Sequence, residues 1–552
     1  MHTNETLDAD YVIVGAGSAG CVLANRLSAD PKLKVVVLEA GGDDRLFAGL
    51  KNFKSKFMIG IPAGFSYVST DPALNWNFVS EPDPYVGNRT FALSRGKVLG
   101  GSSTINGMIY VRGLPQDYEG WRQLGCEGWS WADVLPYFRK SQRQERGADE
   151  WHGVDGPLPV GDPPIRHPMA EQLRQAFIQA GIPATDDLNS GDHEGVTYLQ
   201  GTIKRGRRQT GASAYLHPVR HRPNLMILTD ALVRKVRIEN GEASGVEFDH
   251  GGITKFVSAR AEVILAGGAF NSPQLLQLSG IGDPELLRAH GIPVVQASPS
   301  VGENLQDHYI VQARATLKPG SPSLNARSRG LGLVSSVIQY GLFRRGLLAG
   351  AAAHLTAIAK TRPSLDMPDY QFFSSPASTD VAKTMAAGHT ILDQEPGITI
   401  GGTPARPRSV GHVRIRSADP TTYPAITTNY LSDPYDQQTT IAGIRLGRKI
   451  MAQPALADFI VLPTRPAYDA MSDDEILDHA RQAGGSIYHY VGTCRMGGED
   501  AVVDPRLKVR GVRRLRVVDA SVMPRIVSGN TNGAVVMIAE KASAMILEDR
   551  QR

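Results

Sequence analysis

The stretch Tyr11-Val12-Ile13-Val14-Gly15-Ala16-Gly17-Ser18-Ala19-Gly20 decides the fold class. Its first four residues are apolar and mostly β-branched, which is the composition of a buried strand. A G-x-G-x-x-G motif follows at once, and residues 18–28 have the apolar spacing of a helix that ends at Asp30-Pro31. Residues 35–38 predict a second strand. This order of strand, glycine loop, helix and strand is typical of a dinucleotide-binding βαβ unit.

Each part of this unit has a physical role. Gly15 permits a tight turn, Gly17 lets the backbone approach a pyrophosphate, and Gly20 lets the helix pack close to the strand. The helix begins at Ser18-Ala19, where free N–H groups and the positive end of the helix dipole favour phosphate. Glu39 follows Gly20 by 19 residues, about where a carboxylate accepts hydrogen bonds from ribose hydroxyls. The motif alone leaves both FAD and NAD open.

Composition narrows the function classes. A chain of 552 residues predicts two domains, or one large domain with insertions. Its hydrophobic content of 41% and charged content of 21% are typical of a soluble globular protein. The net charge of +4 gives no reason to expect nucleic acid as a partner. The three cysteines, Cys21, Cys126 and Cys494, lack the spacing of a zinc site, so no metal is expected.

Targeting and membrane signals are also weak. The polar, acidic N-terminus lacks the basic start and apolar core of a signal peptide. The apolar run at residues 346–353 is too short to span a bilayer. We therefore expect a cytoplasmic protein with no integral membrane segment, and peripheral contact with the inner membrane stays open.

Two further stretches could carry chemistry. Residues 95–106 offer small residues and backbone N–H groups that could bind an anion, although a surface loop would have a similar composition. Near the C-terminus, His489 precedes the run Ser528-Gly529-Asn530-Thr531-Asn532. A histidine titrates near neutral pH and can act as a general base. The alternative is a buried, hydrogen-bonded histidine in a loop.

Four stretches together resemble the glucose–methanol–choline (GMC) flavoprotein oxidoreductases. Residues 95–106 are similar to the first signature of that family, and residues 268–282 to the second. Residues 301–308 and 517–524 also resemble the family. The likeness runs from about residue 10 to about residue 545, and is greatest to bacterial alcohol dehydrogenases of the choline dehydrogenase branch.

The resemblance implies FAD rather than NAD, in an α/β (α+β overall) fold. It implies a Rossmann-like FAD-binding domain and a discontinuous substrate domain on an antiparallel sheet. Family members with covalent FAD carry a histidine where this chain has Ile105, which predicts non-covalent FAD. The expected cofactor-binding residues are Gly15, Gly17, Ser18, Ala19, Gly20, Glu39, Ala40, Lys97, Gly100, Gly101, Ser102, Asn106, Gly107, Val233, Asp519, Ala520, Asn530 and Thr531.

The resemblance also implies a reaction. His489 aligns with the active-site histidine of the family, and Asn532, rather than Asn530, is expected as its partner. The implied function is oxidation of a primary alcohol to an aldehyde, with hydride transfer to flavin N5 and His489 as the base. A dehydrogenase is favoured over an oxidase, while a quinone-like carrier and oxygen both stay open as acceptors. The alternatives are a hydroxynitrile-lyase-like enzyme and a non-enzymatic FAD-binding protein.

The resemblance also divides the chain into segments. We expect FAD-binding segments at residues 1–160, 216–312 and 481–552, and substrate-domain segments at residues 161–215 and 313–480. Residues 369–373 and 412–416 alternate as strands do and are expected in the antiparallel sheet. The charges of Arg205-Gly206-Arg207-Arg208 are expected in a solvated loop or an interface. Tyr490 replaces the proline of many relatives and could line the pocket or an interface. The sequence makes no prediction of oligomeric state.

Overall fold

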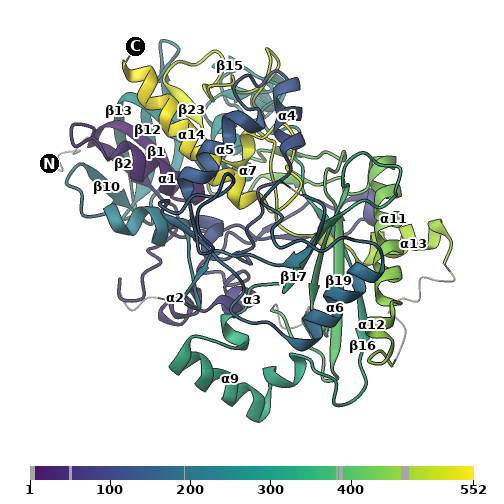
Figure 1. Ribbon diagram of the computed structural model, residues 1–552. Coiled ribbons are helices and arrows are strands. Elements are labelled where there is room, and N and C mark those ends of the chain that lie inside the picture. The colour runs from purple at the N-terminus through teal and green to yellow at the C-terminus, as the bar shows by residue number, and fades with distance from the viewer. Residues whose placement is uncertain are drawn as a thin grey trace.

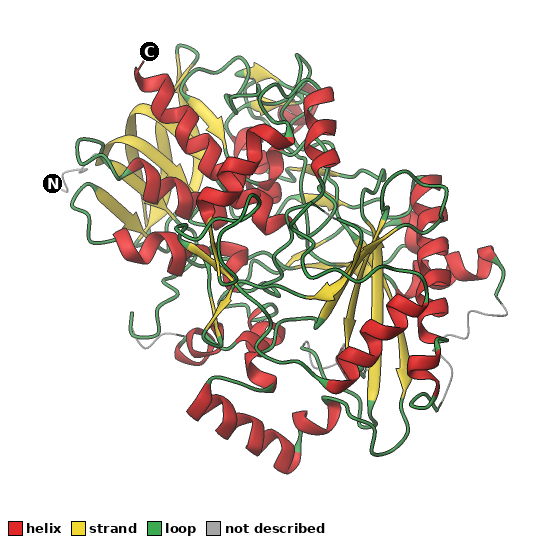
Figure 2. Ribbon diagram, viewed as in Figure 1, coloured by secondary structure: helices red, strands yellow, loops and turns green. Residues whose placement is uncertain are grey.

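Two large sheets organise the computed structural model, which describes residues 7–48, 52–191, 193–380, 383–384, 389–461 and 471–551 (Figures 1 and 2). The first sheet has the strand order β10-β2-β1-β13-β12-β11, and β23 also pairs with β13. Its parallel part contains β1 (Leu7–Val14), β2 (Val35–Leu38), β10 (Leu225–Leu228) and β23 (Leu515–Val517). Antiparallel pairing joins β11 (Leu232–Glu239), β12 (Glu242–His250) and β13 (Ile253–Leu265).

The βαβ unit forms as its sequence predicts. Helix α1 (Ser18–Leu27) connects β1 to β2, and all four residues of β2 are buried. Such strands are apolar throughout because both faces of a parallel sheet are covered. Helix α14 (Thr531–Gln551) contacts α1 and α5 (Trp131–Ser141), so the two ends of the chain meet on this sheet (Figure 1).

The second sheet is antiparallel, in the order β22-β16-β19-β18-β17-β7. On β18, Phe372 packs on Phe177 of helix α6 (Pro168–Gln179), with the ring centres 5.7 Å apart, while Phe373 lines a cavity. Neighbouring residues of a strand point to opposite faces, so one face is covered by helices and the other faces the cavity. The strands are β7 (Gly195–Tyr198), β16 (Tyr309–Thr316), β17 (Leu355–Ala359), β18 (Tyr370–Ser375), β19 (Gly397–Pro404) and β22 (Gly485–Ser486).

Residues 369–373 were expected in the antiparallel sheet, and β18 confirms this. Residues 412–416 were expected in the same sheet, and this is wrong. Strand β20 (His412–Arg414) pairs with β21 (Ala425–Thr427) in a separate two-stranded sheet. Alternation reports one buried face and does not specify which strand is the neighbour. The domain boundaries at residues 160, 215, 312 and 480 stay a prediction.

Shorter elements complete the described chain. None of its helices is both long and apolar enough to cross a membrane. The remaining helices are α2 (Phe53–Ile59), α3 (Phe65–Val68), α4 (Pro115–Gln123), α7 (Gly268–Leu278), α8 (Pro284–Ala289), α9 (Gly330–Phe343), α11 (Pro434–Met451), α12 (Pro454–Ala457) and α13 (Asp473–Ala483). Short two-stranded pairs are β3 (Phe78–Val79) with β4 (Ala92–Leu93), β5 (Gln142–Gln144) with β6 (Leu158–Val160), β8 (Ile203–Lys204) with β9 (Arg207–Arg208), and β14 (Ile281–Gly282) with β15 (Gln296–Ala297).

Candidate active site

A continuous cavity of about 850 Å³ joins the two sheets. One part is lined by Glu39, at the carboxyl end of β2, and by Val233 of β11. His489 and Asn530 line another, together with Phe373 of the antiparallel sheet. Open α/β sheets bind ligands beyond the carboxyl ends of their parallel strands. The cavity therefore connects a nucleotide-type cradle with a histidine.

The cradle consists of two glycine loops in contact. Gly15 has φ +99°, and a Cβ there would lie 2.6 Å from the Ala266 carbonyl oxygen. Gly101 has φ +52°, and a Cβ there would lie 2.6 Å from the Cα of Gly17. Only glycine fits both positions, because a side chain would clash and the left-handed backbone would be strained. A Cβ on Gly17 would meet no atom closer than 3.9 Å, so its open side faces the cavity.

Glu39 is held at the edge of this cradle. Its carboxylate accepts hydrogen bonds from the backbone N–H groups of Ala16, at 2.8 Å, and Gly41, at 2.9 Å. Burial raises the pKa of Glu39 to about 7, although these two bonds favour the charged form. The carboxylate is thus fixed in place and lines the cavity, as recognition of a ribose hydroxyl requires.

Arg208 supports the second glycine loop, the one that contains Gly101 and Asn106. The sequence did not predict this role. Its buried guanidinium donates to the carbonyl oxygens of Asn106, at 2.6 Å, and Ile59, at 3.1 Å. Burial lowers the pKa of Arg208 to about 9. The expected solvated loop is therefore wrong for this residue, because the β8–β9 turn folds against the loop that contains Asn106. Arg205 and Arg207 are exposed, as expected.

Most of the residues expected from the sequence lie around this one cavity, and three do not. Gly20 packs where a Cβ would lie 1.9 Å from the Gly15 carbonyl oxygen. The Lys97 ammonium lies 4.5 Å from the centre of the Trp76 ring, and Gly100 forms the turn before Gly101. The lining includes Gly15, Gly17, Ser18, Ala19, Glu39, Ala40, Gly101, Ser102, Asn106, Gly107, Val233, His489, Asp519, Ala520, Asn530, Thr531 and Asn532.

His489 is part of a hydrogen-bonded chain that fixes its tautomer. The Nε2 atom of His308 lies 3.0 Å from the Ala405 carbonyl oxygen, which can only accept, so this Nε2 carries hydrogen. In the neutral ring, the Nδ1 of His308 is then an acceptor, and it lies 2.8 Å from the Nδ1 of His489. His489 therefore carries its hydrogen on Nδ1. Its Nε2 presents a lone pair to the side-chain amide of Asn530, whose Nδ2 lies 3.0 Å away.

The surroundings keep His489 neutral. Burial lowers its pKa well below the usual 6.5, and the nearby His308 and Arg95 lower it further. The backbone N–H of His489 donates to Asp307 Oδ1 at 2.7 Å, which holds the loop in place. Burial raises the pKa of Asp307 to about 6, opposed by hydrogen bonds from Ser486 and Tyr430. A neutral imidazole with a lone pair directed into a cavity is suited to accept a proton.

Asn530, rather than the expected Asn532, lies beside His489. Asn530 precedes α14, and its Oδ1 also accepts from the Gln371 side chain at 3.4 Å. The Oδ1 of Asn532 instead accepts from Ser18 Oγ at 2.7 Å, on the glycine loop. Asn530 lies just before the helix and Asn532 lies in its first turn, so their side chains leave the backbone in different directions, and that of Asn532 is held by the glycine loop.

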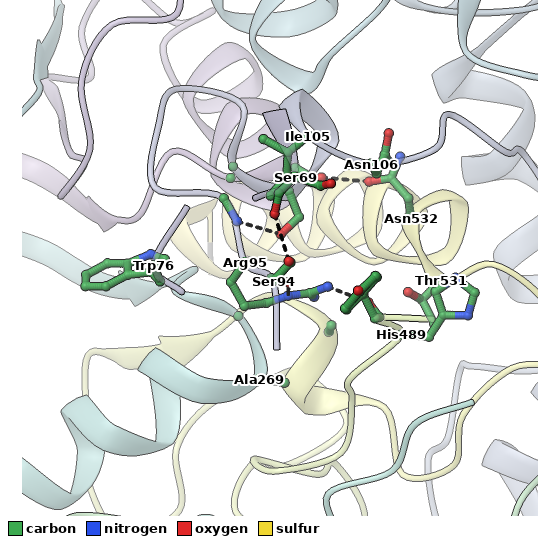
Figure 3. A pocket seen from close by; sticks show the side chains of 18 of the residues that line it. Ser69, Trp76, Ser94, Arg95, Ile105, Asn106, Ala269, His489, Thr531 and Asn532 are labelled. Atoms are coloured by element: carbon green, nitrogen blue, oxygen red, sulfur yellow. Dashed lines mark hydrogen bonds between the residues drawn. The ribbon is translucent and has the colours of Figure 1, made fainter. Parts of the chain in front are cut away.

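Other residues near the site have structural roles. Tyr490 is buried among apolar side chains, and its ring centre lies 4.6 Å from that of Phe270. It therefore lines neither the cavity nor a surface. Cys494 is buried. Trp76 lines the cavity, and in Figure 3 it lies across the view from His489, with Arg95 between them.

Comparison with known proteins places this architecture. Residues 9–310 match the N-terminal family model of the GMC oxidoreductases, and residues 407–539 match the C-terminal one. The chain belongs to the GMC oxidoreductases. Its relatives include an alcohol dehydrogenase [acceptor] of Pseudomonas putida, 42% identical over 98% of this chain and 95% of the relative. The mitochondrial choline dehydrogenase of Mus musculus is 43% identical over 98% of this chain and 90% of that relative.

Solved structures of GMC-type enzymes agree. Pyridoxine 4-oxidase from Mesorbium loti has a TM-score of 0.85 at 28% identity, covering 97% of this chain and 98% of that one. A formate oxidase variant from Aspergillus oryzae, described by its effect on FAD modification, has a TM-score of 0.89 at 26% identity, covering 100% and 99%. Family and neighbours together support FAD as the cofactor of this oxidoreductase.

The residues present fit FAD. The glycine cradle leaves its open side at Gly17 to a pyrophosphate, and Glu39 is placed for a ribose. The cavity then continues without interruption past Ser102 and Asn106 to His489. A bound dinucleotide could thus extend from the cradle to the histidine.

Proposed function

We propose that this GMC oxidoreductase oxidises a neutral primary alcohol to an aldehyde, with non-covalently bound FAD. The lone pair of His489 Nε2, directed toward Asn530 in the cavity, is the observation that carries the proposal. Bound FAD would supply the acceptor for the hydride that leaves the carbinol carbon. In our proposal Asn530 holds the substrate oxygen, and His489 takes the hydroxyl proton at Nε2.

The chain of hydrogen bonds behind His489 supports this role. When Nε2 gains a proton, the ring becomes positive, and its Nδ1–H still donates to the lone pair of His308. His308 in turn remains anchored through its Nε2–H on the Ala405 carbonyl oxygen. A hydrogen bond that involves a charged group is stronger than a neutral one. This arrangement holds the ring in place when Nε2 is protonated, and the stronger hydrogen bond partly offsets the burial and the nearby charge that disfavour the protonated form.

The proposed neutrality of the substrate comes from the charges around the cavity. Among the described lining residues the carboxylates are Glu39 and Asp519. Glu39 accepts two backbone hydrogen bonds, and Asp519 accepts hydrogen bonds from Ser272 Oγ, Ser521 Oγ and two backbone N–H groups. Both therefore already have partners.

Among the described residues, the lining on this side of the cavity combines apolar side chains with neutral polar ones such as Gln312 and Thr379, and Arg95 is its arginine. Ile310 of β16 and Phe373 of β18 line the cavity, and the Arg95 guanidinium, which also lines it, donates to the Tyr488 carbonyl oxygen. A quaternary ammonium group would be desolvated there without a free carboxylate partner, which is costly. A neutral alkyl group loses no comparable hydration.

Two alcohols of nearly the same shape test the proposal. Choline and 3,3-dimethylbutan-1-ol differ mainly in the positive charge on the bulky end. We expect the neutral alcohol to reduce the flavin anaerobically with a kcat/KM at least about tenfold higher, equivalent to about 1.4 kcal/mol. A higher kcat/KM for choline would refute the neutral substrate class, and a flavin that no alcohol bleaches would refute alcohol oxidation.

We further propose a dehydrogenase, with an electron carrier in preference to dioxygen as its acceptor. The Pseudomonas putida relative, named for an unspecified acceptor, supports this choice. Enzyme reduced by alcohol without oxygen would be mixed with a soluble quinone or with air-saturated buffer. Faster reoxidation by air would contradict the proposal.

A further inference from the structure

Helix α9 (Gly330–Phe343) presents an apolar face to solvent. Leu331, Leu342 and Phe343 are 88%, 71% and 66% exposed. Ordinary surface helices place their apolar residues inward and their polar residues outward. The large apolar side chains exposed on α9 are Leu331, Leu333, Val334, Val337, Ile338, Leu342 and Phe343. We call these seven residues the α9 face.

The helix is nevertheless docked on the protein through its other side. The Tyr340 hydroxyl is buried and donates to the carbonyl oxygens of Gly206, at 3.0 Å, and Gly60, at 3.3 Å. Buried Ser336 donates to Gly332 within the helix. Gly206 lies so close to Arg344 that a Cβ there would meet the Arg344 carbonyl oxygen at 2.0 Å. The α9 face is therefore held outward by defined contacts.

Exposed arginines lie at both ends of the α9 face. Residues 321–350 contain four arginines, Arg327, Arg329, Arg344 and Arg345, and neither aspartate nor glutamate. Arg327 precedes the helix, while Arg344 and Arg345 follow it, and all three are exposed. Helix α2 ends at Ile59, just before Gly60, which Tyr340 contacts, and it exposes Phe53, Lys54 and Phe57. Apolar side chains flanked by cations are the pattern of a helix that lies in a membrane interface.

We propose that the α9 face, together with α2, docks the protein on a bilayer surface that contains anionic phospholipid. The apolar side chains would enter the boundary between headgroups and acyl chains, and the flanking arginines would contact lipid phosphates. Figure 1 shows α9 at the lower edge of the molecule, below α2 and α3, where a flat surface could reach it.

Charge argues against a second copy of the chain as the occupant. A two-fold contact through α9 would pair each helix with its own copy in an isologous arrangement. With arginines at both ends of the helix, antiparallel copies would bring Arg327 of one beside Arg344 and Arg345 of the other. No acidic residue within residues 321–350 would compensate them. An anionic lipid surface supplies the missing negative charge.

The surface adjoins the proposed active site. The chain passes from α2 into α3 (Phe65–Val68), and Phe65, Ser66 and Ser69 line the cavity. Docking through α9 and α2 would place this side of the cavity near the lipid. The inference rests on the exposed surface and stands independently of the substrate proposed above.

Vesicle co-sedimentation of the full-length, FAD-loaded protein tests the inference. We expect binding to vesicles of 70% phosphatidylcholine and 30% phosphatidylglycerol, and at least tenfold weaker binding to pure phosphatidylcholine. Binding should fall when salt is raised from about 0.1 M to about 1 M, because screening shortens the range of charge interactions. Equal or undetectable binding to both vesicles would overturn the proposal.

Two variants assign the binding to α9. The double variant Leu342→Glu/Phe343→Glu should lose at least tenfold in binding to the anionic vesicles. The double variant Arg344→Ser/Arg345→Ser should lose the preference for phosphatidylglycerol. Ile253→Glu is the matched control, since Ile253 is 60% exposed at the start of β13 in the other sheet, and this variant should bind as the parent does. Retained oxidation of a soluble alcohol shows that each variant is folded.

Two outcomes with these variants would overturn the proposal. One is unchanged vesicle binding by Leu342→Glu/Phe343→Glu. The other is a parent protein that dimerises in solution, ignores vesicles, and becomes monomeric on this substitution. That second result would assign the α9 face to a second copy of the chain.

Discussion

The Nδ1 atoms of His308 and His489 lie 2.8 Å apart, so in the neutral pair only one of them carries hydrogen. The carbonyl oxygen of Ala405 decides which, because it requires the hydrogen of His308 on Nε2. The nitrogen of His489 that bears the lone pair is therefore set by Ala405, which directly follows β19. This relationship underlies the first two predictions.

Replacing His489 by alanine should slow flavin reduction by alcohol and leave FAD bound. General base catalysis contributes about 10² to 10⁴ in rate, and we expect a loss of that size. Anaerobic stopped-flow measures the reduction rate, and the visible flavin spectrum measures cofactor content. His489→Gln, which keeps a polar side chain of similar length, should be equally slow. A reduction rate equal to that of the parent would remove His489 from the mechanism.

The pH dependence should report the charge beside His489. Because burial, His308 and Arg95 hold the pKa of His489 below 6.5, the imidazole is unprotonated at neutral pH. The reduction rate should therefore be level above pH 6.5 and fall only in acid. Arg95→Met removes a cation, so the pKa of His489 should rise and the acid limb should move toward neutral pH. Arg95→Lys keeps the charge and should leave the acid limb where it is in the parent. An identical pH profile for both variants would show that the charge of Arg95 does not lower the pKa of His489.

Replacing Asn530 and replacing Asn532 should have different effects on flavin reduction and on FAD content. Asn530→Ala should lower the reduction rate, since a lost hydrogen bond costs about 1 to 3 kcal/mol when a buried partner is left unpaired. Asn532→Ala frees Ser18 Oγ on the glycine loop and should mainly weaken retention of FAD. Rates and FAD content measured for both proteins decide the assignment. The reverse result would restore Asn532 as the partner of His489.

At a pH well above 7, where Glu39 is ionised, Glu39→Gln should weaken FAD binding by roughly tenfold to a hundredfold, because hydrogen bonds to a charged acceptor contribute about 1.5 to 3 kcal/mol. Titration of FAD into the cofactor-free protein measures the affinity. The matched control Glu242→Gln changes a partly exposed, ion-paired glutamate at the start of β12, outside the cavity lining, and should leave the affinity unchanged. Equal affinities in the two variants would place the ribose elsewhere.

FAD should leave the protein on acid precipitation. Ile105, which lines the cavity beside Asn106, has no nucleophilic atom to form a bond with the ring. After trichloroacetic acid treatment we expect yellow flavin in the supernatant and a colourless pellet. Flavin that remains with the washed pellet would reveal a covalent link.

Local patterns explain what the sequence could predict. Strands β1 and β2, helix α1 and the placement of Glu39 depend on residues within one βαβ unit, where periodicity and glycine positions are decisive. The likeness to the GMC family added the cavity-lining residues Ser102 and Asn106, which local periodicity could not supply.

The missed features depend on residues far apart in the chain. His308 and His489 are 181 positions apart, and no spacing rule relates them. The partner of His489 depends on where α14 begins, since a boundary error of one or two residues exchanges Asn530 for Asn532. From the sequence, Arg208 was expected in a solvated turn. Its hydrogen bond to the carbonyl oxygen of Asn106 depends on the fold and could not be predicted from nearby residues.

The cavity draws its walls from the beginning, the middle and the end of the chain. Gly15, Val233 and Asn530 all line it, and β23 joins the first sheet from residues 515–517. During synthesis, therefore, the cradle at Gly15 cannot enclose its cofactor until the segment through Asn532 has emerged from the ribosome. We therefore expect FAD to be enclosed only after this segment has folded onto the first sheet, however early the glycine loops themselves form.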